Sequence, residues 1–292
     1  MDEQDILSRF DNLVESGKVL YDRQQRDFAY IDGDLEFHFL VTSALANKTT
    51  IKTPRSQAGD ENMVKPKLRP GSDISTEGFE VGNIGSDHYV AVNKFCYARP
   101  HLMLLTSDAY KRQYEPLYNN DLEAMWTLLS TFDRDYLAFF NCAKDSGCSR
   151  LHKHMQLIPK PAKSFAAFLD ADNAREPDVP FQWFYHRFDS APITSIYLST
   201  VYSDLVEQAT RASESFRVYT DITSPAAACP HNMILSKRWM IVISRRQAAI
   251  NKEAGANALG MLGVIAVATD NEVQNWVRLG LTNSLSQLGV PR

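Results

Sequence analysis

The sequence predicts an α+β fold, in which an antiparallel sheet and its flanking helices form a single elaborated domain. Of the 292 residues, 44% are hydrophobic and 23% are charged, a balance typical of a globular protein with a substantial core. Strand-prone runs and segments of helical spacing follow one another in an order that favours an α+β domain with an antiparallel sheet. No internal repeat or low-complexity segment interrupts this pattern.

The first half of the chain is predicted to contain a helix, a polar excursion, a strand pair and a second helix. Apolar residues recur at helical spacing over residues 4–17, and Gly17 stands where a helix would stop. Residues 35–46 look strand-like and then helical or looped, whereas residues 48–85 are dense in Pro, Gly, Ser, Asp and Lys. The strand pair is expected over 88–95 and 101–106, and the amphipathic helix over 120–139.

The second half begins with a polar turn at 144–150 and a strand over 151–158 that two prolines close. We divide the chain into residues 1–85, with the N-terminal helix, strands and polar excursion, and residues 86–292, the core with its C-terminal extension, packed as one unit. The remaining segments are an aromatic, irregular stretch over 162–191, a helix over 198–213, a strand or strand pair over 232–244, a small apolar segment over 254–268 and a helix over 271–288.

Charge and hydropathy exclude several classes of protein. The formal net charge is -4 at pH 7, whereas a protein that wraps nucleic acid needs a surplus of clustered Lys and Arg. No stretch approaches the roughly 18 apolar residues of a transmembrane helix, and the N-terminus lacks the apolar segment of a signal peptide. We therefore expect no nucleic-acid partner, no membrane association and a cytoplasmic location, with a nuclear one left open.

The cysteines are expected to stay reduced, because a chain of this size without a signal peptide is typical of a reducing compartment. Cys142 and Cys148 have five residues between them and no CxxC partner, so their spacing does not favour a zinc cluster. We expect no redox role for this pair. The complete set is Cys96, Cys142, Cys148 and Cys229.

The segment His152-Lys-His-Met-Gln156 is the strongest candidate for a functional site in the chain. On a strand, alternate side chains share a face, so His152, His154 and Gln156 are expected to point the same way. A single histidine there would most often be a satisfied core residue, but two histidines and a glutamine on one face favour a functional site. The histidines interpreted as structural are His88, His101, His186 and His231.

Two functional interpretations of this segment compete. A His-x-His pair on a strand also presents metal ligands in cupin-like folds, which would require another carboxylate or histidine. The alternative is a nucleophile beside a phosphate-binding turn. Residues 146–149, Ser-Gly-Cys-Ser, favour the nucleophile because such a turn offers backbone N–H groups and hydroxyls to phosphate oxygens.

The residue types fit attack on phosphorus. A neutral imidazole has a reference pKa of about 6.5, so His154 can attack at physiological pH without losing a proton. Its second ring nitrogen must then be held by an acceptor, commonly a backbone carbonyl. The resulting phosphoramidate can pass the group to a second acceptor. His152 and Gln156 are expected to donate hydrogen bonds to the non-bridging oxygens.

The same residues form a longer pattern that matches a known family. Asn141, the turn Lys144-Asp-Ser-Gly-Cys-Ser149 and His152-Lys-His-Met-Gln156 follow one another in the family's order. These motifs resemble the fungal ATP adenylyltransferases, also called diadenosine tetraphosphate phosphorylases, of the histidine-triad superfamily. Further similar segments lie at 93–95, 101–106, 232–240 and 257–280, so the resemblance covers nearly the whole chain.

The resemblance implies a HIT-like fold and phosphorolysis of diadenosine tetraphosphate to ATP and ADP, or the reverse, through an adenylylated His154. His152 and Gln156 complete the implied catalytic set, with Gln156 in the place of the superfamily's third histidine, as in transferases. Implied contacts are Asn93 to the ribose or adenosine, Asn141 and the turn to phosphate, and Lys48 to polyphosphate. The implied substrate-binding residues are Lys48, Asn93, Asn141, Gly147, Cys148, Ser149, Asn257, Ala258, Leu259 and Val264.

Three departures from the family pattern leave the substrate open. Val264 stands where the family has methionine, Ala268 stands where it has lysine, and the stretch 52–71 lacks its apolar-proline motif. Alternatives are therefore the same chemistry on another nucleotide, such as adenosine phosphosulfate or a nucleoside diphosphate, or a nucleotide-binding protein with reduced turnover. Expected partners are adenine nucleotides and inorganic phosphate. We expect no metal site and no tightly bound cofactor, although a divalent cation could accompany the nucleotide, and the sequence does not predict an oligomeric state.

Overall fold

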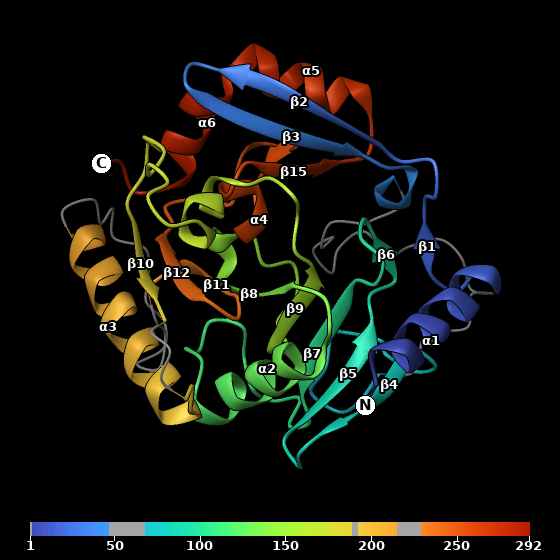
Figure 1. Ribbon diagram of the computed structural model, residues 1–292. Helices are drawn as coiled ribbons and strands as arrows, with labels where there is room; N and C mark the ends of the chain where they lie inside the picture. Colours follow the sequence, from blue (N-terminus) through green and yellow to red (C-terminus); the bar gives the residue numbers. More distant parts are fainter. Residues whose placement is uncertain (1, 47–67, 189–191, 215–228) are drawn as a thin grey trace.

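The computed structural model describes residues 2–46, 68–188, 192–214 and 229–292, and an eight-stranded antiparallel sheet forms its centre (Figure 1). The strand order is β10-β12-β11-β8-β9-β7-β5-β4. The two halves of this sheet meet where β8 pairs with β9. The strands are β4 (Glu80–Ile84), β5 (His88–Val92), β7 (Leu102–Thr106), β8 (Tyr136–Cys142), β9 (His154–Pro159), β10 (Trp183–Arg187), β11 (His231–Leu235) and β12 (Trp239–Ser244).

A second, three-stranded sheet joins the two ends of the chain. The hairpin of β2 (Arg26–Asp32) and β3 (Leu35–Val41) comes from the N-terminal part, yet β3 pairs in parallel with β15 (Val264–Val267). Figure 1 shows this sheet above the central one, beside α5 and α6. Short ladders join β1 (Leu20–Tyr21) to β6 (Phe95–Cys96) and β13 (Ala249–Asn251) to β14 (Ala254–Gly255).

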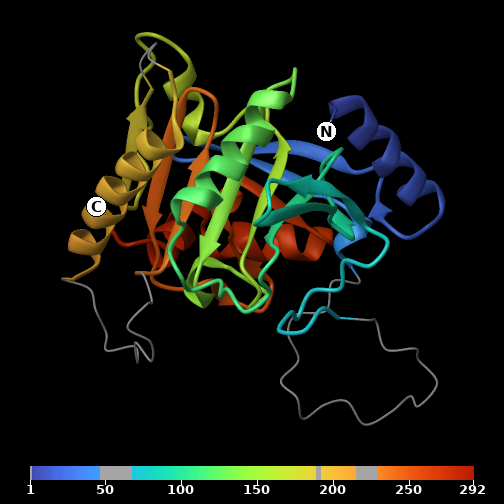
Figure 2. The same ribbon diagram turned by 90° about the horizontal axis from the view of Figure 1, so that it is seen from below.

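Helices cover both faces of the central sheet, and the sheet divides the core in two. Strand β8 is buried along its whole length, with Leu137 and Phe139 in one core and Ala138 and Phe140 in the other. Helices α1, α2 and α3 pack against the second of these faces, where α2 crosses in front of the strands in Figure 2. The helices are α1 (Glu3–Glu15), α2 (Asn119–Thr131), α3 (Ser195–Glu214), α4 (Ala258–Met261), α5 (Asp270–Leu279) and α6 (Leu281–Leu288), with 3-10 turns at Ser43–Leu45, Lys144–Ser146 and Phe165–Asp170.

Elements with strong local patterns are confirmed. The N-terminal helix appears as α1, the helix predicted over 198–213 as α3, and the first strand pair as the antiparallel neighbours β5 and β7. The run over 232–244 forms the hairpin β11–β12. None of the helices in the described part of the chain is both long and apolar enough to cross a membrane.

The helix predicted over 120–139 is wrong in its second half. Helix α2 ends at Thr131, and Tyr136 and Phe139 belong to strand β8 instead. The two aromatic residues continue the helical spacing of α2, but every residue of β8 is buried. A strand covered on both faces reads as a continuous apolar run, which periodicity alone cannot distinguish from a buried helix.

Other boundaries also differ from the predictions. The strand expected over 151–158 begins only at His154, and His152 forms an isolated bridge with Arg112. The helix expected over 271–288 is broken into α5 and α6 at Gly280, whose φ of 78° lies in the left-handed region that favours glycine. The stretch expected to be irregular contains β10, and the polar excursion ends in β4.

Candidate active site

His154 is the first residue of β9, and its two ring nitrogens have different surroundings. The side chain is 6% exposed, and its Nδ1–H donates to the carbonyl of His152 at 2.8 Å. Within the described residues, Nε2 has no hydrogen-bond partner. Burial lowers the pKa of His154 to about 4, so the ring is neutral at physiological pH. This arrangement leaves a lone pair on Nε2, as a nucleophile requires.

His152 supports His154 through its backbone in this arrangement. Its ring is fully buried, Nε2 donates to the carbonyl of Thr106 at 2.9 Å, and Nδ1 lies 2.9 Å from Ser72 Oγ. Both ring nitrogens therefore already have protein partners, so a hydrogen bond from His152 to phosphate would require one of them to be exchanged. That role stays a prediction.

The metal-ligand interpretation gains no support from this geometry. In the described ranges, no three His, Cys, Asp or Glu side chains gather closely enough to hold a metal ion. The ring of His152 is engaged as described above, and Nδ1 of His154 is occupied by a carbonyl.

The carboxylate of Asp73 explains why β9 begins late. It accepts the backbone N–H of Leu151 at 2.8 Å and that of His152 at 2.9 Å. These two N–H groups are thereby satisfied by a side chain rather than by a neighbouring strand. Asp73 and Ser72 thus clamp the residue whose carbonyl orients His154.

Gln113 is a site residue that the sequence reasoning missed. The ladder between β8 and β9 ends at the pair Phe139 and Gln156, and the Gln113 side chain occupies the gap beyond it. Its Oε1 accepts the N–H of His154 at 2.8 Å, while its Nε2 donates to the carbonyls of His154 and Asn141 at 3.0 and 3.1 Å. Gln113 is 1% exposed, and its three hydrogen bonds replace pairing between β8 and β9 at the nucleophile. No local pattern marks it.

Gln156 and Asn93 are brought together by a histidine that was interpreted as structural. Nε2 of His101 lies 2.9 Å from Gln156 Oε1 and 3.2 Å from Asn93 Nδ2. The amide nitrogen of Gln156 has no partner among the described residues, and Gln156 lies two residues from His154 on the same face of β9. His101 immediately precedes β7, and the pairing of β7 with β9 brings it beside this strand.

The predicted phosphate turn packs against the start of α4. Gly147 has a φ of 86°, and a Cβ at this position would lie 2.7 Å from the carbonyl oxygen of Ala256. Close approach therefore requires glycine here. Asn141 Oδ1 accepts the backbone N–H of Ala258 at 2.9 Å. Four predicted residues, Asn141, Gly147, Asn257 and Ala258, are thus adjacent in the fold.

Cys148 and Ser149, the last two residues of this turn, have no regular secondary structure. Within the described residues their backbone N–H groups have no hydrogen-bond partner, which leaves them able to bind an anion. Burial raises the pKa of the Cys148 thiol to about 11, so it is not a thiolate at neutral pH.

Arg245 holds the turn and its surroundings together. It is 3% exposed, and burial lowers its pKa to about 9, which leaves it charged at neutral pH. The guanidinium donates to the carbonyls of Ser146 at 3.3 Å and Ala256 at 2.9 Å, and to Asn232 Oδ1. Because a buried charge needs hydrogen-bond partners, these bonds stabilise the arrangement of the turn beside α4.

The structure does not bring all predicted residues to this place. Val264 is a buried core residue of β15, and the N–H of Ala268 is bonded to Glu272 at 3.0 Å. The backbone N–H of Leu259 donates to Asn257 Oδ1, so Asn257 caps α4. Lys48 lies outside the described residues.

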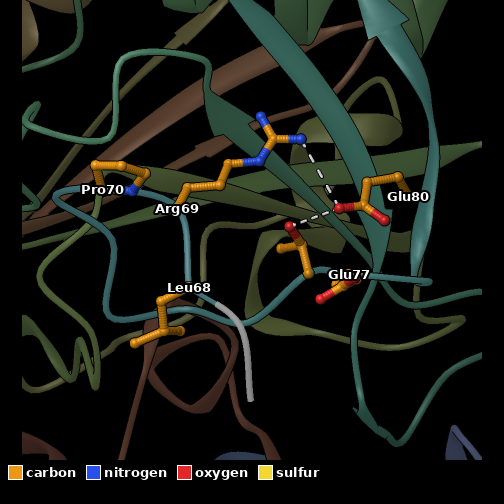
Figure 3. Close-up of a pocket in the computed structure, with 6 residues that line it drawn as sticks. Leu68, Arg69, Pro70, Glu77 and Glu80 are labelled. Carbon is orange, nitrogen blue, oxygen red and sulfur yellow. Dashed lines mark hydrogen bonds and ion pairs between the residues drawn. The ribbon is translucent and has the colours of Figure 1, made fainter. Parts of the chain in front are cut away.

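A pocket of 320 Å³ lies beside the clamp, but none of the predicted site residues lines it (Figure 3). Arg69 and Glu80 form an ion pair across it at 3.8 Å, and Glu80 also accepts from Thr76. The guanidinium of Arg69 lies over the ring of Tyr89. One cation, Arg69, and two acids, Glu77 and Glu80, line it, so its charge does not resemble that of a polyphosphate site.

Two family models match the chain. The Ap4A phosphorylase N-terminal domain matches residues 20–171, which is more than half of the chain, and the ATP adenylyltransferase C-terminal domain matches residues 177–291. The chain belongs to the Ap4A phosphorylase family. The resemblance found in the sequence motifs is thereby confirmed.

Relatives from Saccharomyces cerevisiae show the same relationship. Diadenosine 5',5'''-P1,P4-tetraphosphate phosphorylase 2 is 25% identical over 275 residues, which cover 84% of this chain and 82% of the relative. Protein APA1 is 27% identical over 217 residues, which cover 65% of each. The family therefore extends over most of this chain.

Solved structures of the family share the fold. Yeast Ap4A phosphorylase Apa2 matches with a TM-score of 0.75 at 22% identity, covering 100% of this chain and 98% of Apa2. Apa2 in complex with Ap4A gives a TM-score of 0.75 at 21% identity, with the same coverage. This similarity confirms the predicted α+β fold.

Proposed function

We propose that this protein is a nucleotidyltransferase that phosphorolyses diadenosine tetraphosphate to ATP and ADP through a covalent His154–AMP intermediate. The observation that carries the proposal is the state of His154: a neutral ring, Nδ1–H held by a carbonyl, and Nε2 without a partner among the described residues. Membership of the Ap4A phosphorylase family supports an enzyme of this type.

In the first step, the Nε2 lone pair attacks the α-phosphorus of one adenosine end. The N–P bond forms as the P–O bond to the neighbouring phosphate breaks, and ATP leaves. Positive charge develops on the ring, where the bond from Nδ1–H to the His152 carbonyl strengthens. The amide nitrogen of Gln156, two residues along the same face, is placed to donate to a non-bridging oxygen.

In the second step, inorganic phosphate attacks the phosphoramidate and forms ADP, and the electron pair returns to Nε2. His154 therefore needs no external base in either direction. Because its pKa is about 4, it remains unprotonated throughout the neutral range. Loss of activity caused by protonation of the nucleophile is expected only as the pH approaches that value.

Adenine nucleotides are the proposed ligands. One yeast relative is named for its action on diadenosine tetraphosphate, and two of the similar Apa2 structures are complexes, one with AMP and one with Ap4A. The proposed phosphate contacts are the N–H groups of Cys148 and Ser149, which have no partner among the described residues and belong to a turn that packs on α4. A divalent cation bound with the nucleotide remains part of the proposal, as does a role for Lys48.

A second candidate keeps the nucleophile and changes the substrate. Ala268, where the family pattern expects lysine, contributes only a backbone N–H that Glu272 already accepts. The distal half of a dinucleotide would then be held less tightly there. Adenosine phosphosulfate or a nucleoside diphosphate, which have no second nucleoside, would tolerate this change.

The test is to incubate the protein with diadenosine tetraphosphate and phosphate, follow ATP and ADP, and detect the adenylyl adduct by mass spectrometry. We expect an adduct on the wild type and none on His154→Ala, because Ala has no nucleophilic nitrogen. The control is His186→Ala, whose ring contacts Tyr197 Oη and should be dispensable.

An undiminished adduct on His154→Ala would contradict the proposed nucleophile. Adduct formation from adenosine phosphosulfate but not from diadenosine tetraphosphate would select the second candidate. Nucleotide binding without any adduct would instead identify a binding protein that has lost turnover.

A further inference from the structure

Two side-chain amides compete for a single histidine ring nitrogen beside the nucleophile. Nε2 of His101 lies 2.9 Å from Gln156 Oε1 and 3.2 Å from Asn93 Nδ2. His101 is 1% exposed, and its ring packs edge-on against Tyr97 with 4.7 Å between ring centroids. The ring is therefore held in place, and the two amides share one atom.

Only one of these two contacts can be a hydrogen bond at a time. An amide oxygen only accepts and an amide nitrogen only donates, whereas Nε2 carries either a hydrogen or a lone pair. With a hydrogen, Nε2 donates to Gln156 Oε1 and opposes the NH₂ group of Asn93. With a lone pair, it accepts from Asn93 and opposes the oxygen of Gln156.

Asn93 cannot resolve this conflict by turning its amide over. Its Oδ1 accepts the backbone N–H of Phe95 at 3.2 Å, so a turned amide would place NH₂ against that N–H. Gln156 has no comparable restraint, because its amide nitrogen has no partner within the described residues. The tautomer of His101 therefore decides which way Gln156 faces.

We propose that His101 is a positioning residue whose tautomer couples Gln156 to Asn93 when a nucleotide binds. A phosphate oxygen at Gln156 requires the amide NH₂ there, so Gln156 Oε1 must face His101 and Nε2 must carry the hydrogen. The NH₂ group of Asn93, whose amide stays held by Phe95, then loses its acceptor on His101 and donates to an oxygen of the nucleotide instead. Phosphate binding at one residue thus frees a donor at the other. This inference deepens the proposed function and rests on it.

The first test observes the tautomer directly in the wild-type protein. Long-range ¹H–¹⁵N spectra of histidine-labelled protein, with the His101 signal assigned from the His101→Phe spectrum, report which nitrogen carries hydrogen. We expect a mixture of tautomers in the free protein and the Nε2–H form with AMP. A lone pair on Nε2 in the AMP complex, a free protein already wholly in the Nε2–H form, or no effect of AMP would overturn the proposal.

The second test asks whether His101 acts through Gln156. We expect His101→Phe to lower kcat for phosphorolysis roughly tenfold, because the Gln156 amide loses its fixed orientation. In a Gln156→Met background, the same replacement should have little further effect. Multiplied losses in the double variant would overturn the proposal, because they would assign His101 a packing role independent of Gln156.

The control is His186→Phe, since His186 is a half-buried histidine whose Nε2 contacts Tyr197 Oη at 2.8 Å. We expect it to keep wild-type kcat. Different measurements test the two proposals. A wild type without turnover would contradict the proposed reaction, whereas the spectra with AMP test the tautomer coupling independently of turnover.

Discussion

Single hydrogen-bonding atoms determine whether His154 can act. The ring is neutral because burial lowers its pKa, and the His152 carbonyl fixes the hydrogen on Nδ1. Its backbone is fixed by Gln113, whose one amide meets both the N–H and the carbonyl of His154. Because the side chain starts from this backbone, an error at Gln113 would move Nε2 relative to the α-phosphorus.

Gln113→Glu is the prediction at this scale. The substitution preserves shape but replaces an NH₂ donor with an oxygen that faces the carbonyls of Asn141 and His154. We expect the rate of adenylyl-adduct formation to fall by about tenfold or more, with a smaller change in nucleotide affinity. Rapid-quench mass spectrometry of the adduct measures the rate.

The matched control is Gln182→Glu, because the amide of Gln182 donates to one carbonyl, that of Pro291, away from β9. It should leave the rate unchanged. Adduct formation by Gln113→Glu at the wild-type rate would show that Gln113 does not hold the nucleophile.

Among the elements, β9 has incomplete strand pairing at its N-terminal end. The ladder with β7 starts at His154 and the ladder with β8 at Gln156, whereas Leu151 and His152, just before β9, are held by a loop. Asp73 supplies that loop's carboxylate. The stretch 68–76 is therefore connected to the nucleophile through His152.

Asp73→Ala tests this connection. Removing both acceptors should lower the free energy of unfolding by about 1 kcal/mol and slow adduct formation, because the His152 carbonyl is no longer held. Asp73→Asn keeps one acceptor oxygen and should be intermediate. Urea unfolding and the adduct assay measure the two effects.

Asp22→Ala provides the comparison, since Asp22 accepts the backbone N–H groups of Gln24 and Ser43 in a different loop. A similar loss of stability without slower adduct formation is expected. If both alanine variants slowed the adduct equally, the effect of Asp73 would be general destabilisation.

In the whole molecule, strand pairing and hydrogen bonds join segments that are distant in the chain. Strand β3 pairs with β15, and Arg245 joins the turn at Ser146 to β11 and to the carbonyls of Ala256 and Leu288. Residues from the C-terminal part of the chain thus contact the predicted phosphate turn and Asn141. A change there would alter both stability and the phosphate turn.

Arg245→Met is the prediction for the whole molecule. It leaves several buried oxygens without donors, so we expect a loss of about 3 kcal/mol or more in the free energy of unfolding. The control is Arg238→Met, whose side chain is 53% exposed beside Asp170 and should cost less than about 1 kcal/mol. Urea unfolding measures the free energy of unfolding of both variants, and equal losses would contradict the role of Arg245.

The sequence by itself determined the family, the α+β class, the strongly periodic elements and the proposed nucleophile. Local spacing predicted α1, α3 and the β5–β7 and β11–β12 pairs, because each depends on neighbours a few residues away. It failed at Tyr136 and Phe139, where a fully buried strand continued the helical spacing of α2. The roles of the individual site residues stay predictions.

Only the tertiary structure decided what holds and orients those residues. Gln113 lies 41 positions from His154, His101 lies 55 from Gln156, and Asp73 lies 79 from His152. Strand pairing and loop packing create these contacts, and no local periodicity records them. The sequence names the reactive histidine, whereas the fold sets its tautomer, its backbone position and the direction of the amide beside it.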